Sequence, residues 1–290
     1  MSDPVDPANP ATSTGAAGSA AMQAANAPAN LRLRRCRHGM MLYRLNDTFI
    51  GRSLELYGEM GEREVGVLCG LVAPGDVALE IGSNIGTNVV PLARRVGPQG
   101  TVIAFEPQRQ VHQMLCANVA LNGFGNVIAL WGAAGAEAGW IRVPSINYEA
   151  KGNFGGVSLS AEAWGERVPM MTVDGLEMKA CRLMKVDVEG MEIEVLKGAA
   201  QTIARLRPRL YVENDRREKS AALISHIVAL GYRCYWHLPP LFNRDNFRQH
   251  AENVFGNIVS VNMLCLPPGD ALDVSRLRPV SGPDDDWRRQ

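Results

Sequence analysis

Charge of one sign and clustered cysteines are both missing from this 290-residue sequence. Lysine plus arginine and aspartate plus glutamate number 30 each, so the chain has no overall field that would attract nucleic acid or an anionic membrane. Its six cysteines are widely spaced, and no two form a Cys-x-x-Cys pair. A zinc or iron–sulfur site is therefore not expected, and the cysteines are interpreted as core thiols of a reducing compartment.

Long hydrophobic runs are also absent. No stretch of about 18 apolar residues occurs, so no helix is expected to span a membrane. The first residues are not typical of a signal peptide, because Asp3 and Asp6 replace the usual positive charge and no apolar segment follows. A cytoplasmic protein is the resulting expectation. Residues 1–30 have almost no large apolar side chains, and we expect them to be disordered.

Strands and helices are predicted to alternate from residue 76 onward. Apolar runs typical of strands lie at 77–81, 101–105, 126–131, 182–187, 209–212, 232–237 and 258–266, and helical patterns lie at 87–96, 109–121, 192–206 and 219–230. Short antiparallel strands are expected at 138–143 and 157–159. The alternation predicts a doubly wound α/β sheet, and the last strand–loop–strand unit predicts an antiparallel hairpin at one edge.

The first of these strands ends in an acidic residue and a glycine-containing turn. Glu80 closes an apolar run, and Gly82 and Gly86 follow at a spacing typical of a tight turn before a helix. Glycines allow a ligand to approach the backbone, and the start of a helix offers unpaired N–H groups. A carboxylate here suits a ligand with an ammonium group or donor hydrogens better than a pyrophosphate. Asn84 stands where a dinucleotide-binding turn requires glycine, and no Gly-Lys-Ser/Thr follows.

A second informative stretch, Lys185-Val-Asp187-Val-Glu189-Gly190, ends a later strand. The turn Glu80-x-Gly82-x-Asn84-x-Gly86 resembles motif I of class I S-adenosylmethionine-dependent methyltransferases. More narrowly it resembles the FkbM-type family, in which Asn is common at the third of these positions, and the second stretch resembles that family's other signature. The two lie about 100 residues apart, in the family's order and both at strand ends. Together they are more specific than either alone.

The resemblance implies a Rossmann-like sheet of seven strands in the order 3-2-1-4-5-7-6, with helices on both faces. It also implies that residues 31–72 form a small N-terminal cap over the cofactor. Within the cap, a strand or hairpin is predicted at 40–50 with Asn46-Asp47 at its turn, and a helix at 59–71. Residues 73–267 are then the methyltransferase domain. Residues 268–290, rich in Pro, Asp and Arg, are predicted to be a loose C-terminal tail.

Ligands of such sheets bind beyond the carboxyl ends of the strands, so the residues expected to bind S-adenosylmethionine share one edge. They are Glu80, Gly82, Asn84, Gly86, Glu106 and Ala133. Glu106 ends the second strand, 20 residues after Gly86, where a carboxylate can hold a ribose diol. Alternatively, Glu106 complements the dipole of the next helix. Ala133 belongs to a run of small residues that would leave room for adenine, or that forms a close-packed turn.

The implied reaction is in-line attack of a nucleophile on a sulfonium methyl group, which requires alignment and, for a hydroxyl, removal of its proton. Asp187 and Glu189 are the expected bases, with His237 in reserve. Glu189 could instead cap the helix that follows, and His237 could be a packed core histidine. The family's association with hydroxyl groups on sugars, lipids and secondary metabolites implies O-methylation.

A metal is not the favoured prediction. One option is that Asp187, Glu213 and Asn214, which follow neighbouring strands, hold Mg²⁺ as a similar set does in catechol-type O-methyltransferases. The ion would lower the pKa of an acceptor hydroxyl. Glu213 departs from the Asp that is usual in that set. The two carboxylates could also bind hydroxyl groups of the acceptor directly.

The expected partner is a small molecule or glycan that carries a hydroxyl group. The loop 238–257 is predicted to overhang it, and its polar side chains beside phenylalanines suit a saccharide but also a solvated surface loop. Within the loop 147–156, Asn153-Phe-Gly-Gly resembles a family loop near the substrate, and an ordinary hairpin excursion is the alternative. The sequence carries no indication of the oligomeric state.

Three other functions are alternatives to an O-methyltransferase. A nucleic-acid methyltransferase is disfavoured, because Asp187-Val-Glu-Gly stands where base methylation typically requires Asn/Asp-Pro-Pro-Tyr/Phe, and no basic stripe supports phosphate binding. A dinucleotide-dependent oxidoreductase would need a third glycine in the first turn. The remaining alternative is a non-catalytic cofactor-binding module of the same fold.

Overall fold

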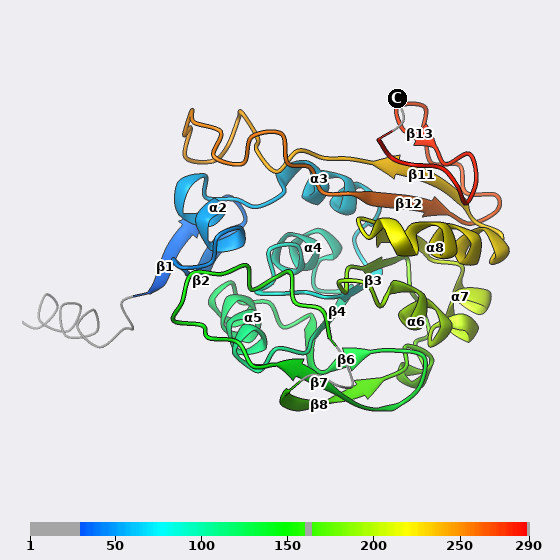
Figure 1. Ribbon diagram of the computed structural model, residues 1–290, viewed down its shortest axis with the longest axis horizontal. Helices are drawn as coiled ribbons and strands as arrows, with labels where there is room; N and C mark the ends of the chain where they lie inside the picture. Colours follow the sequence, from blue (N-terminus) through cyan, green and yellow to red (C-terminus); the bar gives the residue numbers. More distant parts are fainter. Residues whose placement is uncertain (1–29, 160–163, 289–290) are drawn as a thin grey trace, which may run out of the picture.

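The computed structural model describes residues 30–159 and 164–288. The predicted disorder of residues 1–30 therefore concerns, apart from Asn30, residues outside the described part. The described chain is built around one large sheet (Figure 1). The sheet has eight strands in the order β13-β11-β12-β10-β9-β3-β4-β5. None of its described helices has the length and apolar character needed to cross a bilayer.

Five neighbouring strands of this sheet are parallel. They are β5 (Val127–Trp131), β4 (Thr101–Glu106), β3 (Val77–Ile81), β9 (Leu183–Val186) and β10 (Arg209–Glu213). β12 (Asn262–Leu266) runs antiparallel to both β10 and β11 (Arg233–His237). This is the predicted order 3-2-1-4-5-7-6 with a short additional strand, β13 (Arg278–Pro279), at the edge beside β11. The predicted fold class is confirmed.

Helices cover both faces of the sheet (Figure 1). On one face lie α3 (Glu62–Gly70), α4 (Val89–Val96) and α5 (Arg109–Leu121), and on the other α6 (Glu192–Lys197), α7 (Ala200–Leu206) and α8 (Arg217–Ala229). Alternation along the strands produces two cores, because successive side chains of a strand point to opposite faces. Ala78 and Leu183 pack with the first group of helices, whereas Leu79 and Met184 pack with the second.

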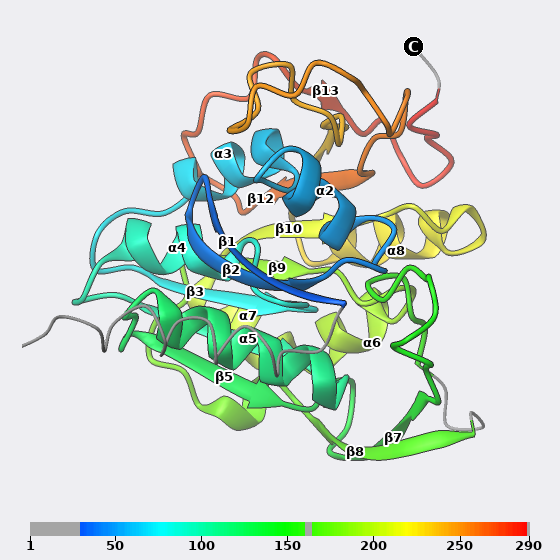
Figure 2. The same ribbon diagram turned by 90° about the vertical axis from the view of Figure 1, so that its left-hand side faces the viewer.

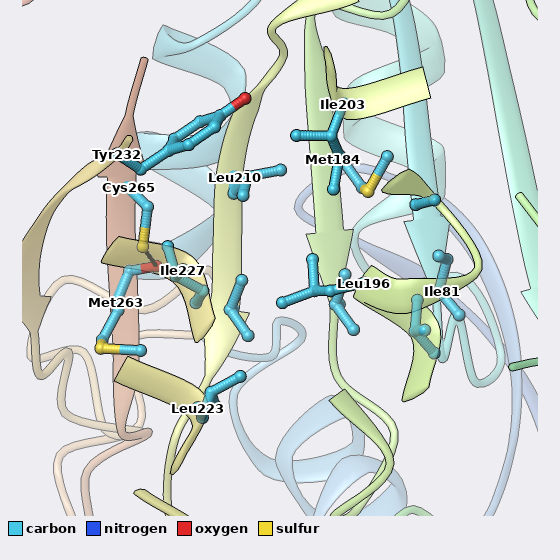
Figure 3. Close-up of a cluster of buried hydrophobic side chains, with 14 of the residues drawn as sticks. Ile81, Met184, Leu196, Ile203, Leu210, Leu223, Ile227, Tyr232, Met263 and Cys265 are labelled. Carbon is cyan, nitrogen blue, oxygen red and sulfur yellow. Dashed lines mark hydrogen bonds between the residues drawn. The ribbon is translucent and has the colours of Figure 1, made fainter. Parts of the chain in front are cut away.

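Figure 3 shows the core under the second group of helices. Leu196 and Ile203 from α6 and α7, with Leu223 and Ile227 from α8, meet Ile81, Met184, Leu210 and Met263 of the sheet. All of these side chains are at most 2% exposed. Burial of each of these side chains stabilises the fold by roughly 1.5–3 kcal/mol. This packing holds in place the strand ends that carry the site.

The helix predicted at 192–206 is divided into α6 and α7 at Gly198. A Cβ atom on Gly198 would lie 2.0 Å from the carbonyl oxygen of Gly135, so only glycine allows this backbone contact. The carboxylate of Asp174, in the 3-10 helix Asp174–Leu176, accepts hydrogen bonds from the N–H groups of Gln201 and Thr202. These hydrogen bonds satisfy two N–H groups in the first turn of α7, which begins at Ala200.

The N-terminal segment is a hairpin followed by a helix that the sequence did not predict. β1 (Leu31–Cys36) pairs with β2 (Gly39–Arg44), so the turn lies at residues 37–38 and not at Asn46-Asp47. Asp47 Oδ1 instead accepts hydrogen bonds from the N–H groups of Phe49 and Ile50 at the start of α2 (Ile50–Leu56). Figure 2 shows the hairpin beside α5, whose Asn118 and Asn122 bond to the β2 backbone.

Two further strand predictions need correction. β7 (Gly139–Pro144) pairs with β8 (Gly165–Met171), and β6 (Ala133–Ala134) joins β8 to form a separate three-stranded sheet. Residues 157–159 are not a strand, because the partner of β7 comes later in the chain. β12 begins at Asn262, and residues 259–261 before it line the site described below.

Residues 268–288 are packed against the sheet and are not a loose tail. β13 pairs with Trp236 of β11, and the carboxylate of Asp285 accepts hydrogen bonds from Trp236 Nε1 and Arg278. Arg209 forms two hydrogen bonds, of 2.8 and 3.0 Å, with the carboxylate of Asp270. The prediction of a loose tail is wrong because several charged side chains of this segment, among them Asp270, Arg278 and Asp285, have partners in the structure.

Candidate active site

Two adjoining cavities open beyond the carboxyl ends of β3, β4, β9 and β10. The smaller follows β4 toward β6, and the larger extends from the turn after β3 toward α3 and the segment before β12. Five residues line both cavities: Gly82, Glu106, Gly155, Asp187 and Glu189. The cavities thus form one site at the switch point of the sheet, where such folds bind their ligands.

The turn after β3 requires its glycine. Gly82 has a φ of 89°, and a Cβ atom there would lie 1.7 Å from the carbonyl oxygen of Asp187. Asn84 has a φ of 48°, a left-handed conformation that Asn tolerates better than most residues. Its side chain accepts a hydrogen bond from the N–H of Ile85 at 2.8 Å. The backbone of the turn can therefore lie against a ligand.

Glu106 is fixed by two backbone N–H groups. Asn84 N donates to its Oε2 at 2.9 Å, and Gln108 N donates to its Oε1 at 2.8 Å. The side chain is only 3% exposed. Each carboxylate oxygen can accept a further hydrogen bond, so the group can receive the two hydroxyl groups of a diol.

The smaller cavity is mainly apolar and is lined by small residues on one side. Ala133 and Ala134 of β6 are buried there beside Gly132. The rest of its apolar lining is provided by Ile81, Phe105, Pro107, Val157, Leu159, Val188 and Met191. Its position next to Glu106 fits a flat heterocycle joined to a ribose.

A buried lysine, Lys185, lines the larger cavity. Lys185 Nζ lies 2.8 Å from Asp187 Oδ2 and 3.6 Å from Glu80 Oε1. It is also 3.8 Å from Glu64 Oε1, which α3 brings to the same face of the sheet. Burial alone would lower the pKa of Lys185, but the three carboxylates raise it above its ordinary value. Lys185 is therefore a cation that holds three acidic groups in place.

Glu80 has one oxygen without a partner. Asn88 Nδ2 donates to its Oε1 at 3.1 Å, whereas its buried Oε2 has no hydrogen-bond partner among the described residues. The side chain is 1% exposed and lines the larger cavity. A buried carboxylate oxygen without a donor is costly, so this atom is suited to a ligand that supplies one.

The comparison with protein families agrees with this geometry. The family model described as "Methyltransferase FkbM domain" matches residues 80–234, which is more than half of the chain and includes both signature stretches. The chain belongs to the FkbM methyltransferase family. The predicted resemblance is confirmed, and with it the class I methyltransferase fold.

Solved structures similar to this family member include other methyltransferases at low sequence identity. The FkbM methyltransferase of Methylobacillus flagellatus KT is 17% identical over 68% of this chain and 45% of its own, with a TM-score of 0.46. Trm5b from Pyrococcus abyssi is 12% identical over 82% of this chain and 56% of its own, with a TM-score of 0.47. The chain thus spans about half of these two proteins.

Aeropyrum pernix fibrillarin, solved with bound S-adenosyl-L-methionine, is 13% identical over 82% of this chain and 83% of its own, with a TM-score of 0.44. The search of curated proteins found no match.

Most residues that the sequence singled out in this FkbM family member meet at the site. Glu80, Gly82, Asn84, Glu106 and Ala133 each line at least one of the cavities. Gly86 lines neither; it has a φ of 89°, and a Cβ atom there would lie 2.7 Å from Leu115 of α5. Its glycine is thus explained by the turn and by helix packing.

Asp187 and Glu189 both face the cavities, but Glu189 does not cap the following helix. No side-chain hydrogen bond caps the start of α6, and Glu192 Oε1 accepts hydrogen bonds from the N–H groups of Val188 and Gly190 in the loop before it. Glu189 instead forms a salt bridge with Arg216, which follows β10. The sequence contained no periodic signal for this pairing, because the two residues lie on different loops.

His237 and the side chain of Asn214 lie away from Asp187 and Glu189. His237 lines neither cavity, and its Nδ1 is 2.7 Å from Tyr211 Oη in the sheet. The side chain of Asn214 is buried and contacts Met263. Adjacent residues at the end of a strand point in opposite directions, so Asn214 does not join Glu213 in the set that the metal option required.

Residues of two loops also line the larger cavity. Asn153, Gly155 and Gly156 line the larger cavity, as does Leu241 of the loop 238–257. That loop is held to the N-terminal segment by Glu59, whose carboxylate accepts hydrogen bonds from Asn243 and from the N–H of Phe247. Figure 2 shows it beside α2 and α3. Glu64, Lys185 and Arg216 are site residues to which the sequence analysis assigned no role.

The buried carboxyl groups should make stability depend on pH. Burial raises the pKa of Glu80, Glu106 and Glu189 to about 7 each, whereas an unfolded Glu titrates near 4.3. Between these values the folded chain holds more protons, so its stability falls as pH rises. His226 and His237, whose pKa burial lowers, act in the opposite sense near pH 6.

We therefore expect Glu80→Gln to reduce the loss of stability between pH 6 and pH 8, because Gln cannot ionise. Thermal unfolding of both proteins at the two pH values measures the difference. An equal loss in the variant and the wild type would contradict the assignment of a raised pKa to Glu80.

Proposed function

We propose that this FkbM family member is an S-adenosylmethionine-dependent O-methyltransferase that acts on a hydroxyl group of a saccharide, lipid or other polyhydroxylated metabolite. The observation that carries the proposal is the pair of joined cavities, one mainly apolar beside Glu106, the other acidic and extending to the loop 238–257. The first has the chemistry of a nucleoside site. The second has room for an acceptor.

The residues present fit the cofactor at each of its parts. Ala133 and its apolar neighbours would hold the adenine, and Glu106 would accept the ribose hydroxyl groups. The backbone at Gly82 and the unpartnered Oε2 of Glu80 would face the amino acid portion, whose ammonium group is a donor. Bound there, S-adenosylmethionine supplies a methyl group made electrophilic by a positively charged sulfur.

The acidic lining supports a cationic cofactor and argues against an anionic acceptor. Seven acidic side chains and two basic ones line the larger cavity. The acidic ones are Glu64, Glu80, Glu106, Asp187, Glu189, Glu213 and Asp215, and the basic ones are Lys185 and Arg216. Such a surface attracts a sulfonium and repels phosphate, which favours an uncharged hydroxyl acceptor over nucleic acid.

The roles of the protein are to align the acceptor and to take its proton. Asp187 and Glu189 line both cavities, so either carboxylate lies where the methyl donor and the acceptor would meet. Lys185 orients Asp187, and Arg216 orients Glu189. Either carboxylate would accept the hydroxyl proton as the oxygen attacks in line. Asp187 is the stronger candidate, because its position is set by β9 and by the contact with Gly82.

Calorimetric titration with S-adenosylmethionine, with NAD⁺ as the control, tests the cofactor assignment. We expect micromolar binding of the first and none of the second. The protein is then incubated with methyl-labelled cofactor and a panel of sugars, glycolipids and RNA. Methylation of a hydroxylated small molecule supports the proposal, whereas methylation of RNA alone supports a nucleic-acid methyltransferase. Binding without transfer to any acceptor supports a non-catalytic module, and absence of binding would refute the cofactor assignment.

A further inference from the structure

Three carboxylates converge where the two cavities meet the end of β10. One oxygen each of Asp187, Glu189 and Glu213 lies within 4.8 Å of an oxygen of both others. The three come from the ends of β9 and β10 and from the loop after β9, so the sheet fixes two of them. All three line the larger cavity.

The two residues that form salt bridges use only one oxygen each. Asp187 contacts Lys185 through Oδ2, and Glu189 contacts Arg216 through Oε2. Within the described ranges, the other oxygen of each residue accepts no side-chain or backbone hydrogen bond. Two oxygens therefore remain free to face a further ligand.

Glu213 supplies a separate indication. Its carboxylate has no salt bridge in the part of the chain that the structure describes, and its Oε2 is buried without any hydrogen-bond partner. An oxygen of Asp187 lies within 4.8 Å of an oxygen of Glu213. Two carboxylates this close repel each other unless they share a proton or a cation. A buried oxygen without a partner, next to the free oxygens of Asp187 and Glu189, is suited to sharing a cation with them.

We propose that Asp187, Glu189 and Glu213 bind one divalent cation of the Mg²⁺ or Mn²⁺ type. Carboxylate oxygens are the ligands these hard ions prefer, and such ions retain water molecules that an acceptor hydroxyl can replace. The set differs from that expected from the sequence, with Glu189 in place of Asn214. The binding of the ion does not depend on the proposed function. The role of the ion does depend on the proposed function, because in a methyltransferase the ion would lower the pKa of the coordinated hydroxyl.

Titration of the full chain with Mn²⁺, without S-adenosylmethionine, tests the site directly. Free Mn²⁺ gives a six-line electron paramagnetic resonance signal that is lost on binding, so the bound ion is counted without any activity. We expect one Mn²⁺ per wild-type chain, displaced by Mg²⁺, and at least tenfold weaker binding in Glu213→Gln. Glu166→Gln, a carboxylate paired with Arg109 outside the cluster, should bind as the wild type does.

Glu213→Gln should unfold at a temperature similar to that of the wild type, which shows that the variant is folded. Because the Mn²⁺ titration contains no S-adenosylmethionine, its outcome is separate from that of the cofactor test. Asp187→Asn provides a second ligand variant if Glu213→Gln does not fold. No bound Mn²⁺ in the wild type would overturn the proposal and would leave a proton shared between Asp187 and Glu213. Equal Mn²⁺ binding by Glu213→Gln, Asp187→Asn and the wild type would overturn it as well.

Discussion

Replacing Glu106 with Ala is expected to weaken the binding of S-adenosylmethionine by about 10²–10⁴-fold. The carboxylate is buried and fixed by the N–H groups of Asn84 and Gln108, so it is ready to accept both ribose hydroxyl groups. Hydrogen bonds to a charged group contribute roughly 1.5–3 kcal/mol each, and about 1.4 kcal/mol corresponds to a tenfold change in affinity. Loss of two such bonds gives the expected effect.

Calorimetry on the wild type and the variant measures this change. Glu106→Gln retains one acceptor and the shape of the side chain, so we expect a smaller loss of about tenfold. Glu166→Ala removes an exposed carboxylate outside the cavities and should leave the affinity unchanged. If Glu106→Ala bound the cofactor as tightly as the wild type while unfolding at a similar temperature, Glu106 would be a purely structural residue of the turn.

Replacing Lys185 with Met is expected to destabilise the protein by about 3–5 kcal/mol at pH 8. Removal of one partner from a buried ionic group costs this much because the remaining charges lose their compensation. Here Asp187, Glu80 and Glu64 would remain together without the cation that lies 2.8 to 3.8 Å from them. Met approximates the length of the lysine stem, so loss of packing contributes little.

Denaturant unfolding followed by fluorescence measures the change in stability. The matched control is Lys197→Met, because Lys197 pairs with Glu194 on the surface and is 51% exposed. Such pairs contribute about 0–1 kcal/mol. The destabilisation by Lys185→Met should also be smaller at pH 5, where the carboxyl groups can take up protons. A variant as stable as the wild type at both pH values would show that Lys185 does not compensate the cluster.

Glu106 and Lys185 belong to the same acidic site. The site concentrates acidic groups, and burial raises the pKa of several of them toward neutrality. Without a ligand the chain compensates this charge with Lys185 and Arg216. A sulfonium cofactor and a divalent cation would each add positive charge to the same cavity. We therefore expect the binding of either ligand to raise the free energy of unfolding.

The sequence alone determined the strand ends and what they carry. Glu80, Gly82, Glu106 and Asp187 were placed at one edge because apolar runs stop at them, and parallel strands present their carboxyl ends together. The order of the sheet followed from the family signatures and is confirmed. Local chemistry also accounted for the helix Arg109–Leu121, whose predicted bounds agree with the structure.

Only the tertiary structure decided which side chains meet. Lys185 is one residue of a short strand, and its three acidic partners come from positions 64, 80 and 187. Glu189 is paired with Arg216 and not with a helix end, and Asn214 is turned away from Glu213 by the alternation of β10. The polar C-terminal segment is packed because its charges find partners on distant strands. Periodicity reports which face of an element is apolar, whereas these pairings depend on how the elements are placed against one another.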